Sequence, residues 1–421
     1  MLSLLEYGET EECRGRSVSL GDLFHNCNLK DLKPGTRYYY RVVIPEKMLG
    51  LNDRGVTVPF TVTGMRQDWV GRHESPLQSF VTPVRYEVLP RELYVAPDGQ
   101  GDGSGPEQPL GGLAAASRLV QPGDTLVLLP GTYHETYYGL VSGLPGRPIT
   151  LKARQPGTVI FDGSDFLRPG ALHLYNCDHY VIDGLIIRNY SNKTFASRAA
   201  QEYGQLQAFA CRNLTIRNCV FSGFGVYQYL ITLKCCSEVL IENNVFADGV
   251  NSITGTGNGN LSILHNTFFV PSIYHFTFSN PEAGAKITVR HNLFLAQIAK
   301  KALDKVGRCL INGEVTLDFD ANAWYFPPED TMRYVGLEGQ FPPKDCEFPA
   351  GLARVRKATG QEKNGRELTE FSFRDHPFIN PMDTEKYSRE VARPFSEGKI
   401  LPTLDYFATT LSDVGAQPLS R

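Results

Sequence analysis

Short runs of alternating apolar and polar residues recur along much of the chain, and this period of two predicts β-strands. In the first 88 residues, such runs cover positions 3–7, 38–43, 58–63 and 78–84. Residues 110–120 form an apolar, Ala-rich stretch that predicts a short helix instead. The sequence therefore predicts an all-β protein with a short helical segment ahead of its central region.

A six-residue motif with an apolar first position repeats through the centre of the chain, and most copies end in an aromatic residue. The copies begin at Ile182, Ile216, Ile241, Ile263, Val289 and Phe319, so they are 34, 25, 22, 26 and 30 residues apart. A repeat of this length is one coil of a solenoid together with a loop of variable length. We therefore predict a right-handed parallel β-helix over roughly residues 93–326.

Two further columns follow from this alignment. Asn occupies the fourth position of four copies, at Asn244, Asn266, Asn292 and Asn322. Because Asn tolerates unusual dihedral angles and its amide can bond the same residue one coil away, we predict a structural ladder at a tight bend. Cysteines recur five residues before the motif, at Cys177, Cys211 and Cys236, and we expect buried free thiols there.

The entrance to the repeats carries a family resemblance. Residues 94–99, 105–109, 121–133, 146–153 and 159–163 form a series of turns and strands around the predicted helix, which is expected to cover the first coil. This arrangement resembles the opening of pectate-lyase-like right-handed β-helix proteins, and residues 413–416 resemble the tail of that superfamily. The resemblance implies the fold, whereas the superfamily includes lyases, hydrolases, epimerases and binding proteins.

The region before the repeats predicts a separate domain. Residues 29–42, with Pro34-Gly35 ahead of three tyrosines, resemble the fibronectin type III pattern, in which a Pro-Gly turn delivers a Tyr to the corner of a β-sandwich. Fewer strands than the sandwich requires are visible, so its start is expected to be truncated. We predict a fibronectin type III-like β-sandwich at 1–88, the β-helix at 89–330 and a C-terminal extension packed on it at 331–421.

Composition and charge exclude several classes of partner. The net charge is −3, from 42 basic and 45 acidic residues, and no basic stripe occurs, so a nucleic acid partner is not expected. No run of 18 apolar residues predicts a membrane span. Nine cysteines do not imply a disulfide framework. We expect a monomer that is secreted or cell-surface, with its export signal outside this sequence.

One face of the predicted β-helix gathers the candidate chemistry. We take Leu172, Leu174 and Leu206 to point into the core. Because side chains alternate along a strand, the following residues then point outward: His173, Tyr175, Gln207, Phe209, Thr232, Lys234, Thr254, Thr256, His275 and Thr277. Long loops beside this face contain Arg198, Tyr203 and Tyr227. Aromatic rings stack on sugars and cations attract acidic glycans. We therefore predict that a polysaccharide is bound by His173, Gln207, Phe209, Thr232, Thr256, Tyr203, Tyr227 and Arg198.

The leading hypothesis for the reaction is β-elimination across a uronic-acid linkage. Such a lyase needs a base for the C5 proton and an acid for the leaving oxygen, and we predict Lys234, His275 and Tyr175 for these roles. The segment around Lys234 resembles alginate and chondroitin lyases of the β-helix type, in which a Lys on this strand is the base. That family has an Arg one coil later in the same column, where this sequence has Thr256.

Two other classes of function stay open. A glycoside hydrolase needs two neighbouring carboxyl groups, which the outward set lacks, so its acids would come from Glu202, Glu242, Asp248 or Glu282. A non-catalytic glycan-binding or cell-surface protein could use the same face. No cluster of Asp residues predicts a cation site, so no cofactor is predicted, and calcium is left as an open alternative.

Overall fold

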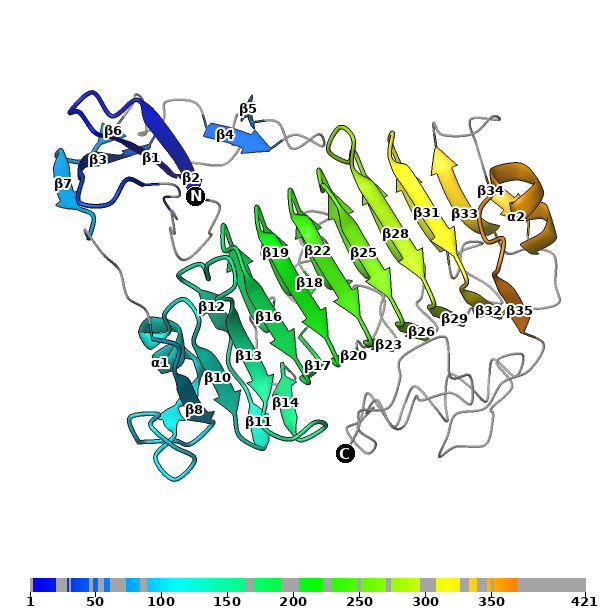
Figure 1. Cartoon of the computed structure of the whole chain (residues 1–421), viewed down its shortest axis with the longest axis horizontal. Helices are drawn as coiled ribbons and strands as arrows, with labels where there is room; N and C mark the ends of the chain where they lie inside the picture. The colour runs from blue at the N-terminus through cyan, green and yellow to red at the C-terminus, as the bar shows by residue number, and fades with distance from the viewer. Residues whose placement is uncertain are drawn as a thin grey trace.

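The computed structural model describes residues 3–19, 29, 32–44, 48–51, 57–60, 73–83, 89–163, 170–190, 204–222, 229–247, 251–269, 274–295, 308–325, 333–338, 347–349 and 352–368. Three long sheets of almost entirely parallel strands run through residues 92–368, and their strands stand side by side along the long axis of the molecule (Figure 1). No helix in the described ranges is long and apolar enough to span a membrane.

Each coil of the chain adds one strand to each of the three sheets. Sheet 1 consists of β8 (Glu92–Ala96), β9 (Leu110–Gly111), β10 (Thr125–Leu128), β13 (Ile149–Ala153), β16 (Tyr180–Asp183), β19 (Arg212–Arg217), β22 (Ser237–Glu242), β25 (Leu261–Leu264), β28 (Lys286–Arg290) and β31 (Thr316–Asp320). Sheet 2 consists of β11 (Gly131–Tyr133), β14 (Val159–Asp162), β17 (Ile186–Arg188), β20 (Val220–Ser222), β23 (Val245–Ala247), β26 (Thr267–Phe269), β29 (Leu293–Leu295), β32 (Ala323–Tyr325) and β35 (Arg366–Leu368). Sheet 3 consists of β12 (Tyr137–Gly139), β15 (Leu172–Tyr175), β18 (Gly204–Phe209), β21 (Tyr229–Lys234), β24 (Asn251–Thr256), β27 (Tyr274–Ser279), β30 (Arg308–Asn312), β33 (Arg333–Glu338) and β34 (Glu347–Pro349).

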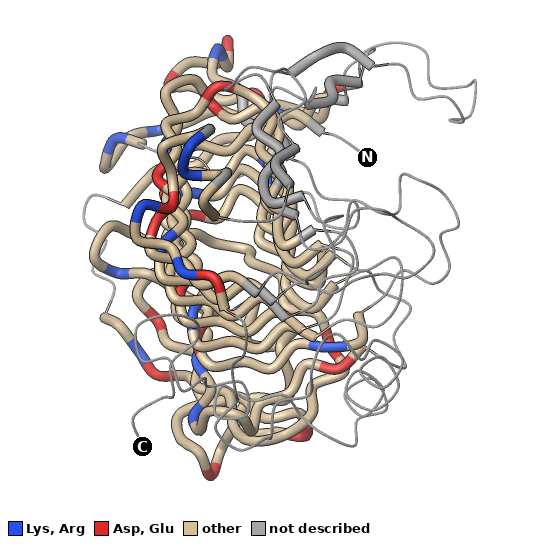
Figure 2. The backbone as a smooth tube through the Cα atoms, turned by 90° about the vertical axis from the view of Figure 1, so that its right-hand side faces the viewer, with Lys and Arg blue, Asp and Glu red and all other residues tan. Residues whose placement is uncertain are grey.

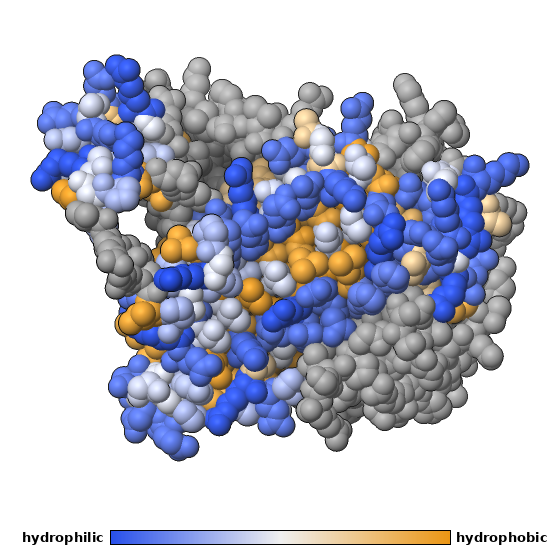
Figure 3. Space-filling view, viewed as in Figure 1, coloured by the Kyte–Doolittle hydropathy of each residue, from blue (hydrophilic) through white to orange (hydrophobic). Residues whose placement is uncertain are grey.

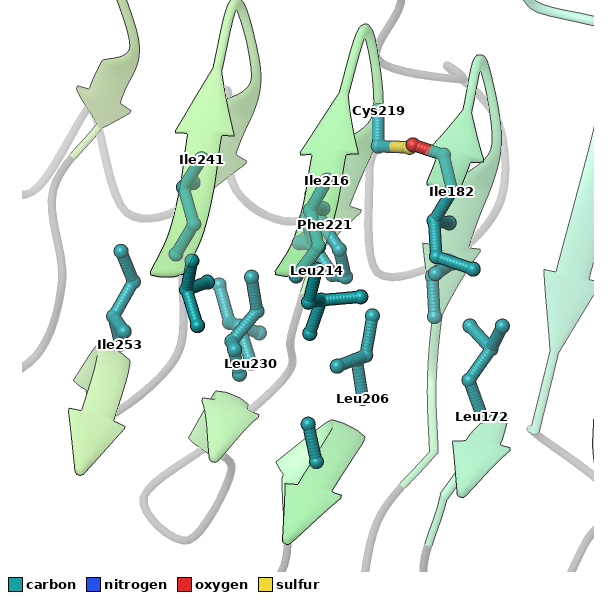
Figure 4. Packing of buried hydrophobic residues seen from close by; sticks show 14 of the residues in the cluster. Leu172, Ile182, Leu206, Leu214, Ile216, Cys219, Phe221, Leu230, Ile241 and Ile253 are labelled. Carbon is teal, nitrogen blue, oxygen red and sulfur yellow. The ribbon is translucent and has the colours of Figure 1, made fainter. Parts of the chain in front are cut away.

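The register confirms the coil alignment made from the repeat. In sheet 1, Ile182 pairs with Ile216, and the pairing continues through Ile241, Ile263, Val289 and Phe319. The fold is therefore a right-handed parallel β-helix in which each repeat climbs one coil. Figure 4 shows residues of sheet 1, such as Ile216, pointing into the interior toward residues of sheet 3, such as Leu206.

The Asn ladder lies at the bend between sheets 1 and 2. Asn244 N–H and Nδ2 both donate to Oδ1 of Asn266 at 2.9 and 3.0 Å, and the same pattern links Asn266 to Asn292 and Asn292 to Asn322. All four side chains are fully buried. The predicted ladder is confirmed, but the strained dihedral angle lies one residue earlier, at Asn243, His265, His291 and Ala321, where φ is between 53 and 57°. The ladder Asn is needed for its amide rather than for its backbone.

The cysteine column is a second ladder, at the bend between sheets 3 and 1. The Sγ atoms of Cys177, Cys211 and Cys236 donate to main-chain carbonyls of the preceding coil at 3.1–3.2 Å. All three thiols are free and buried, as predicted. Burial raises the pKa of the Cys236 thiol well above its usual value, because the thiolate would lose its hydration. These thiols are therefore structural.

Two short helices lie at the ends of the stack (Figure 1). The first, α1 (Gly112–Leu119), packs Leu113 and Ala116 into the core beside β8 and β12, as predicted for the first coil. Gly112 begins this helix at φ 76°, and an added Cβ would collide with the carboxylate of Glu135, which accepts from Leu113 N–H. Residues 110–120 therefore protect the apolar end of the β-helix from water.

The coil stack continues beyond residue 330, so the predicted boundary of the β-helix was placed too early. β33 pairs in parallel with β30, β35 pairs in parallel with β32, and α2 (Leu352–Thr359) lies between β34 and β35. The repeat was missed because Glu362 takes the place of the ladder Asn. Its carboxylate accepts from Asn322 Nδ2 at 2.8 Å and from Trp324 Nε1 at 2.9 Å. The predicted tail motif at 413–416 lies outside the described residues.

The first 83 residues form their own antiparallel sheet. β1 (Ser3–Gly8) pairs with β2 (Gly15–Ser19) and β3 (Arg37–Ile44), and β3 also pairs with β6 (His73–Glu74) and β7 (Gln78–Val81). A separate hairpin joins β4 (Met48–Leu51) and β5 (Thr57–Phe60). The hydroxyl of buried Tyr38 accepts from Lys33 N–H at 3.0 Å, which is the local geometry of a tyrosine corner. The fibronectin type III-like assignment stays a prediction.

Candidate functional site on the outward face of sheet 3

Two columns of outward side chains run along sheet 3. In β18 and β21, Leu206, Ala208, Ile231 and Leu233 are buried in the core, and the alternation turns Gln207, Phe209, Thr232 and Lys234 outward. The glutamine column contains His173, Gln207, Thr232, Thr254 and Thr277. The lysine column contains Tyr175, Phe209, Lys234, Thr256 and Ser279. The predicted outward register is therefore confirmed from β15 to β24.

Three side chains at the start of these columns form a closed hydrogen-bonded ring. Tyr175 Oη donates to Gln207 Oε1 at 2.6 Å, and Gln207 Nε2 lies 3.3 Å from His173 Nε2. Because an amide nitrogen can only donate, His173 Nε2 must accept and Nδ1 carries the proton. His173 Nδ1 then donates to Tyr175 Oη over a longer distance of 3.4 Å. The ring fixes the tautomer of His173 as neutral and commits the hydroxyl hydrogen of Tyr175 to Gln207.

Glycine makes room for this ring. A Cβ on Gly170 would lie 2.7 Å from His173 Nε2 and 2.9 Å from Gln207 Nε2. Tyr138 of β12 covers the other side of His173 in an edge-on contact, with ring centroids 5.1 Å apart. His173 and Gln207 are consequently buried, at 7% and 0% exposure. They hold Tyr175 in place and do not offer an open surface to a sugar.

Phe209 and Lys234 continue the lysine column. Phe209 stacks on Tyr175 with a centroid separation of 4.8 Å, and Lys234 Nζ lies 5.1 Å from the centroid of the Phe209 ring. Since β18 lies between β15 and β21, these neighbours cover opposite faces of the ring. Phe209 was expected to stack on sugars, but it is 7% exposed and has no free face. Its place in the structure is to position Lys234 by a cation–π contact.

The threonines of the glutamine column follow. Thr254 Oγ1 lies 3.0 Å from Thr277 Oγ1, and Asn251 Nδ2 donates to Thr277 Oγ1 at 3.4 Å. Sequence analysis did not select Asn251, because strict alternation turns it inward. Thr232 was predicted to bind substrate; its side chain is 1% exposed. Thr256 is half-buried and pairs with Lys234 in the register, in the position where the resembling lyases have Arg.

His275 was predicted on this face, and that placement was wrong. Both His275 and Phe276 are fully buried, as Leu230 and Ile231 are two coils earlier, and the pairing of β27 with β30 shifts between Tyr274 and Phe276. The His275 ring contacts Phe268 and Phe294, with centroid distances of 5.7 and 5.0 Å, and is fully buried. Burial lowers the pKa of His275 to about 3, because the imidazolium would lose its hydration.

Three predicted loop residues, Arg198, Tyr203 and Tyr227, lie outside the described residues. The same holds for Glu202 and Asp248, which were considered as acids for a hydrolase. Of the other two, Glu242 lies on sheet 1, and Glu282 lies after β27. Neither is an outward residue of sheet 3.

Carboxylates are scarce on this face. From β12 to β30, no position of the two columns or their register partners is Asp or Glu. The next one in the lysine column is Glu338 of β33, four strands beyond Lys234, or about 19 Å at the usual strand spacing. In the described ranges, no three His, Cys, Asp or Glu residues converge as cation ligands.

Charged residues gather on sheet 1 instead. Figure 2 shows blue and red segments concentrated along that side of the coil stack. Arg217 pairs with Asp183 at 3.0 Å and Arg290 pairs with Asp318 at 2.7 Å, which links neighbouring coils. Sheet 1 faces the viewer in Figure 3, where hydrophilic bands flank a hydrophobic centre. By contrast, Lys234 is the one charged residue in the two columns of sheet 3 from β15 to β27.

Comparisons with known proteins support the fold. The family described as "Right handed beta helix region" matches residues 152–296. "Uncharacterized protein YwoF" of Bacillus subtilis is 32% identical over 105 residues, which is 24% of this chain and 22% of that protein. "Pectate lyase PEL9" of Emericella nidulans is 26% identical over 198 residues, which is 41% of this chain and 46% of that protein. The chain thus spans less than half the length of these curated relatives.

Among solved structures, "Crystal structure of pectate lyase Pel9A" is similar with a TM-score of 0.39 and 16% identity, over 69% of this chain and 78% of that one. A Yersinia enterocolitica family 28 exopolygalacturonase is similar with a TM-score of 0.38 and 12% identity, over 72% of this chain and 66% of that one.

Proposed function

We propose that this protein acts on polysaccharides and cleaves an acidic, uronic-acid-containing glycan by β-elimination on the outward face of sheet 3. The observation that carries the proposal is the position of Lys234. Its ammonium group lies over Phe209 in a column that is otherwise uncharged from β15 to β27. Partial sequence similarity to a pectate lyase supports the same class of reaction.

Lys234 is the base in the proposed reaction. The amine that forms when the Lys234 ammonium group gives a proton to water removes the proton at C5 of the uronate. The electron pair of that C–H bond forms the C4–C5 double bond, and the C4–O glycosidic bond breaks. The ammonium group formed at Lys234 then returns a proton to the departing oxygen, so the enzyme regains its starting state. Tyr175 stays a predicted alternative acid, although its hydrogen is donated to Gln207 before substrate arrives.

A hydrolase is the second candidate, and the distribution of carboxylates disfavours it. Inverting and retaining glycosidases hold two carboxyl groups within about 10 Å. The columns beside Lys234 supply none over the described strands β12 to β30. A glycan-binding protein without catalysis would use the same face. We also propose that the protein works outside the cell, where polymers of this size are met.

The lyase proposal is tested by ultraviolet absorbance during incubation with pectate, alginate and glycosaminoglycans, since elimination alone creates an absorbing unsaturated uronate. We expect absorbance to rise with an acidic glycan, and Lys234→Ala to lower kcat at least 100-fold, as for loss of a general base. Lys152→Ala, an exposed lysine of sheet 1, is the matched control and should keep full activity.

Three other results would contradict parts of the lyase proposal. Lys234→Ala with normal thermal unfolding and near-normal kcat would remove that residue from the mechanism. Release of reducing ends without absorbance would replace the lyase by a hydrolase, and binding without either product would leave a glycan-binding protein.

A further inference from the structure

The neutral part of the face beside Lys234 contains hydrogen-bonding atoms without partners. Oδ1 of Asn251 and Oγ1 of Thr232 are both buried, and neither accepts nor donates a hydrogen bond. The two side chains are 5% and 1% exposed. A buried polar atom without a partner destabilises the folded protein, so each calls for a physical explanation.

The side-chain amide of Asn251 directs its NH2 group toward a neighbouring threonine. Its Nδ2 donates to Thr277 Oγ1 at 3.4 Å, and Thr277 Oγ1 also contacts Thr254 Oγ1 at 3.0 Å. The NH2 group of the amide therefore faces the threonines, and Oδ1, which can only accept a hydrogen bond, faces away from them and is available to a ligand. In the register, Asn251 lies between Tyr229 and Tyr274, one coil on either side.

An acceptor selects its ligand by chemistry. A sugar hydroxyl can donate to Asn251 Oδ1 and can exchange hydrogen bonds with Thr232 Oγ1. A carboxylate has no hydrogen to give, so it would set oxygen against oxygen at Asn251. Positions in the two columns from β15 to β27 supply one cation, Lys234, because the hydrogen-bonded ring holds His173 neutral. The two columns therefore offer one positive charge to a carboxylate, and their other polar groups are suited to neutral hydroxyls.

We infer that Thr232, Asn251, Thr254 and Thr277 form a subsite for an uncharged, hydroxyl-bearing sugar next to the acidic sugar that Lys234 receives. The substrate is then a glycan that mixes acidic and neutral units, and a polymer with a carboxylate on every ring is a poor substrate. This inference rests on the proposed function. Both orphan atoms are enclosed, so a sugar reaches them after local opening of the face, and the new hydrogen bonds offset that cost.

The inference is tested by comparing two classes of substrate. The first alternates a uronate with a neutral sugar, as in a rhamnogalacturonan backbone or unsulfated chondroitin, and the second is polygalacturonate or alginate. We expect kcat/KM to be at least tenfold higher for an alternating glycan. Asn251→Leu should lower that value about tenfold, mainly through KM, and so reduce the preference for the alternating glycan over the fully charged polymers.

Thr232→Val separates binding from folding because it keeps the side-chain shape and removes the orphan hydroxyl. If the hydroxyl serves a sugar, this variant melts at a higher temperature than the parent and loses selectivity for the alternating glycan. Thr215→Val on sheet 1, also an outward threonine, is the matched control and should alter neither selectivity nor activity. Should Asn251→Leu fail to fold, Thr232→Val still decides the question.

Two results would overturn the subsite. One is equal or better turnover of the fully charged polymers, and the other is an equal loss on both substrate classes in Thr232→Val and Asn251→Leu. Either would leave the lyase proposal standing, because cleavage by Lys234 would persist. Absence of cleavage and binding for every acidic glycan would instead remove the proposed function itself.

Discussion

The imidazole of His275 lies among the aromatic rings of the β-helix core. Phe294 is 5.0 Å away between centroids, Trp324 is 6.4 Å away, and neither ring nitrogen of His275 has a hydrogen bond. Such a ring stays neutral while the protein is folded, because burial lowers its pKa to about 3 from 6.5. Between these values, the unfolded chain binds a proton that the folded chain does not.

Acid should therefore destabilise the protein through His275. The free energy of unfolding is expected to fall by about 1.4 kcal/mol for each pH unit as pH drops from 6.5 toward 3, with the contribution complete above 6.5. His275→Leu should remove this slope and raise stability at neutral pH, since Leu230 fills the equivalent position two coils earlier. Denaturant titrations at pH 5 and 7.5 measure both effects.

His179→Asn is the control, because this partly exposed histidine has φ 57°, which Asn adopts readily. It should leave the pH dependence unchanged. An unaltered slope in His275→Leu would show that other groups govern acid unfolding.

For single residues, the alternation of side chains along the strands of sheet 3 was sufficient to predict that Tyr175, Gln207 and Lys234 point outward. It failed at His275 because two successive residues, His275 and Phe276, turn inward at the start of β27. A register shift of this kind depends on how the bend before the strand packs, and no local residue type announces it. Asn251 was missed for the same reason.

Ladders are the elements that tie one coil to the next. The Asn ladder passes from Asn244 to Asn322, and the carboxylate of Glu362 replaces the next amide. Glu362 is fully buried with φ 54° and also receives the indole N–H of Trp324. Because an open ladder end would bury donors without acceptors, Glu362 closes the stack chemically as α2 closes it sterically.

Removing that carboxylate should weaken the last coils. Glu362→Ala leaves the buried N–H groups of Asn322 and Trp324 without acceptors, so we expect a loss of about 2–4 kcal/mol in the free energy of unfolding. Chemical denaturation followed by Trp fluorescence measures it. Lys363→Gln, at the exposed neighbouring position, should change stability by less than about 0.5 kcal/mol. Equal stability of the two variants would deny Glu362 this role.

The repeated motif predicted the ladder where Asn recurs, but not its last member, where Glu362 replaces the Asn. Ile, Asn and Phe at fixed offsets made the coil register from Ile182 to Phe319 predictable. The coil containing β33 and β35 escaped notice because Glu362, and not an Asn, supplies its ladder acceptor and because α2 interrupts it. In that coil a carboxylate accepts the hydrogen bonds that an Asn amide accepts in the other coils.

The described strands of the molecule fall into two groups, an N-terminal group and the β-helix, that share no strand pairing. In the described residues, no strand before residue 84 pairs with a strand of the β-helix, and α1 already covers the first coil. A chain that starts at residue 89 is therefore expected to fold and to unfold within a few degrees of the β-helix transition of the full chain. Calorimetry of both chains tests this expectation. Aggregation or a much lower transition in the shorter chain would show that the first 88 residues complete the β-helix.

The intervals between coils vary from 22 to 34 residues, yet the register of sheet 1 stays unbroken from Ile182 to Phe319. The longer intervals therefore leave the strand pairing of sheet 1 undisturbed. Lengthening or shortening one such segment changes the rim of the sheet 3 face at a single coil. Insertions and deletions between strands can therefore change the surface around one coil, while the spacing of the coils stays the same.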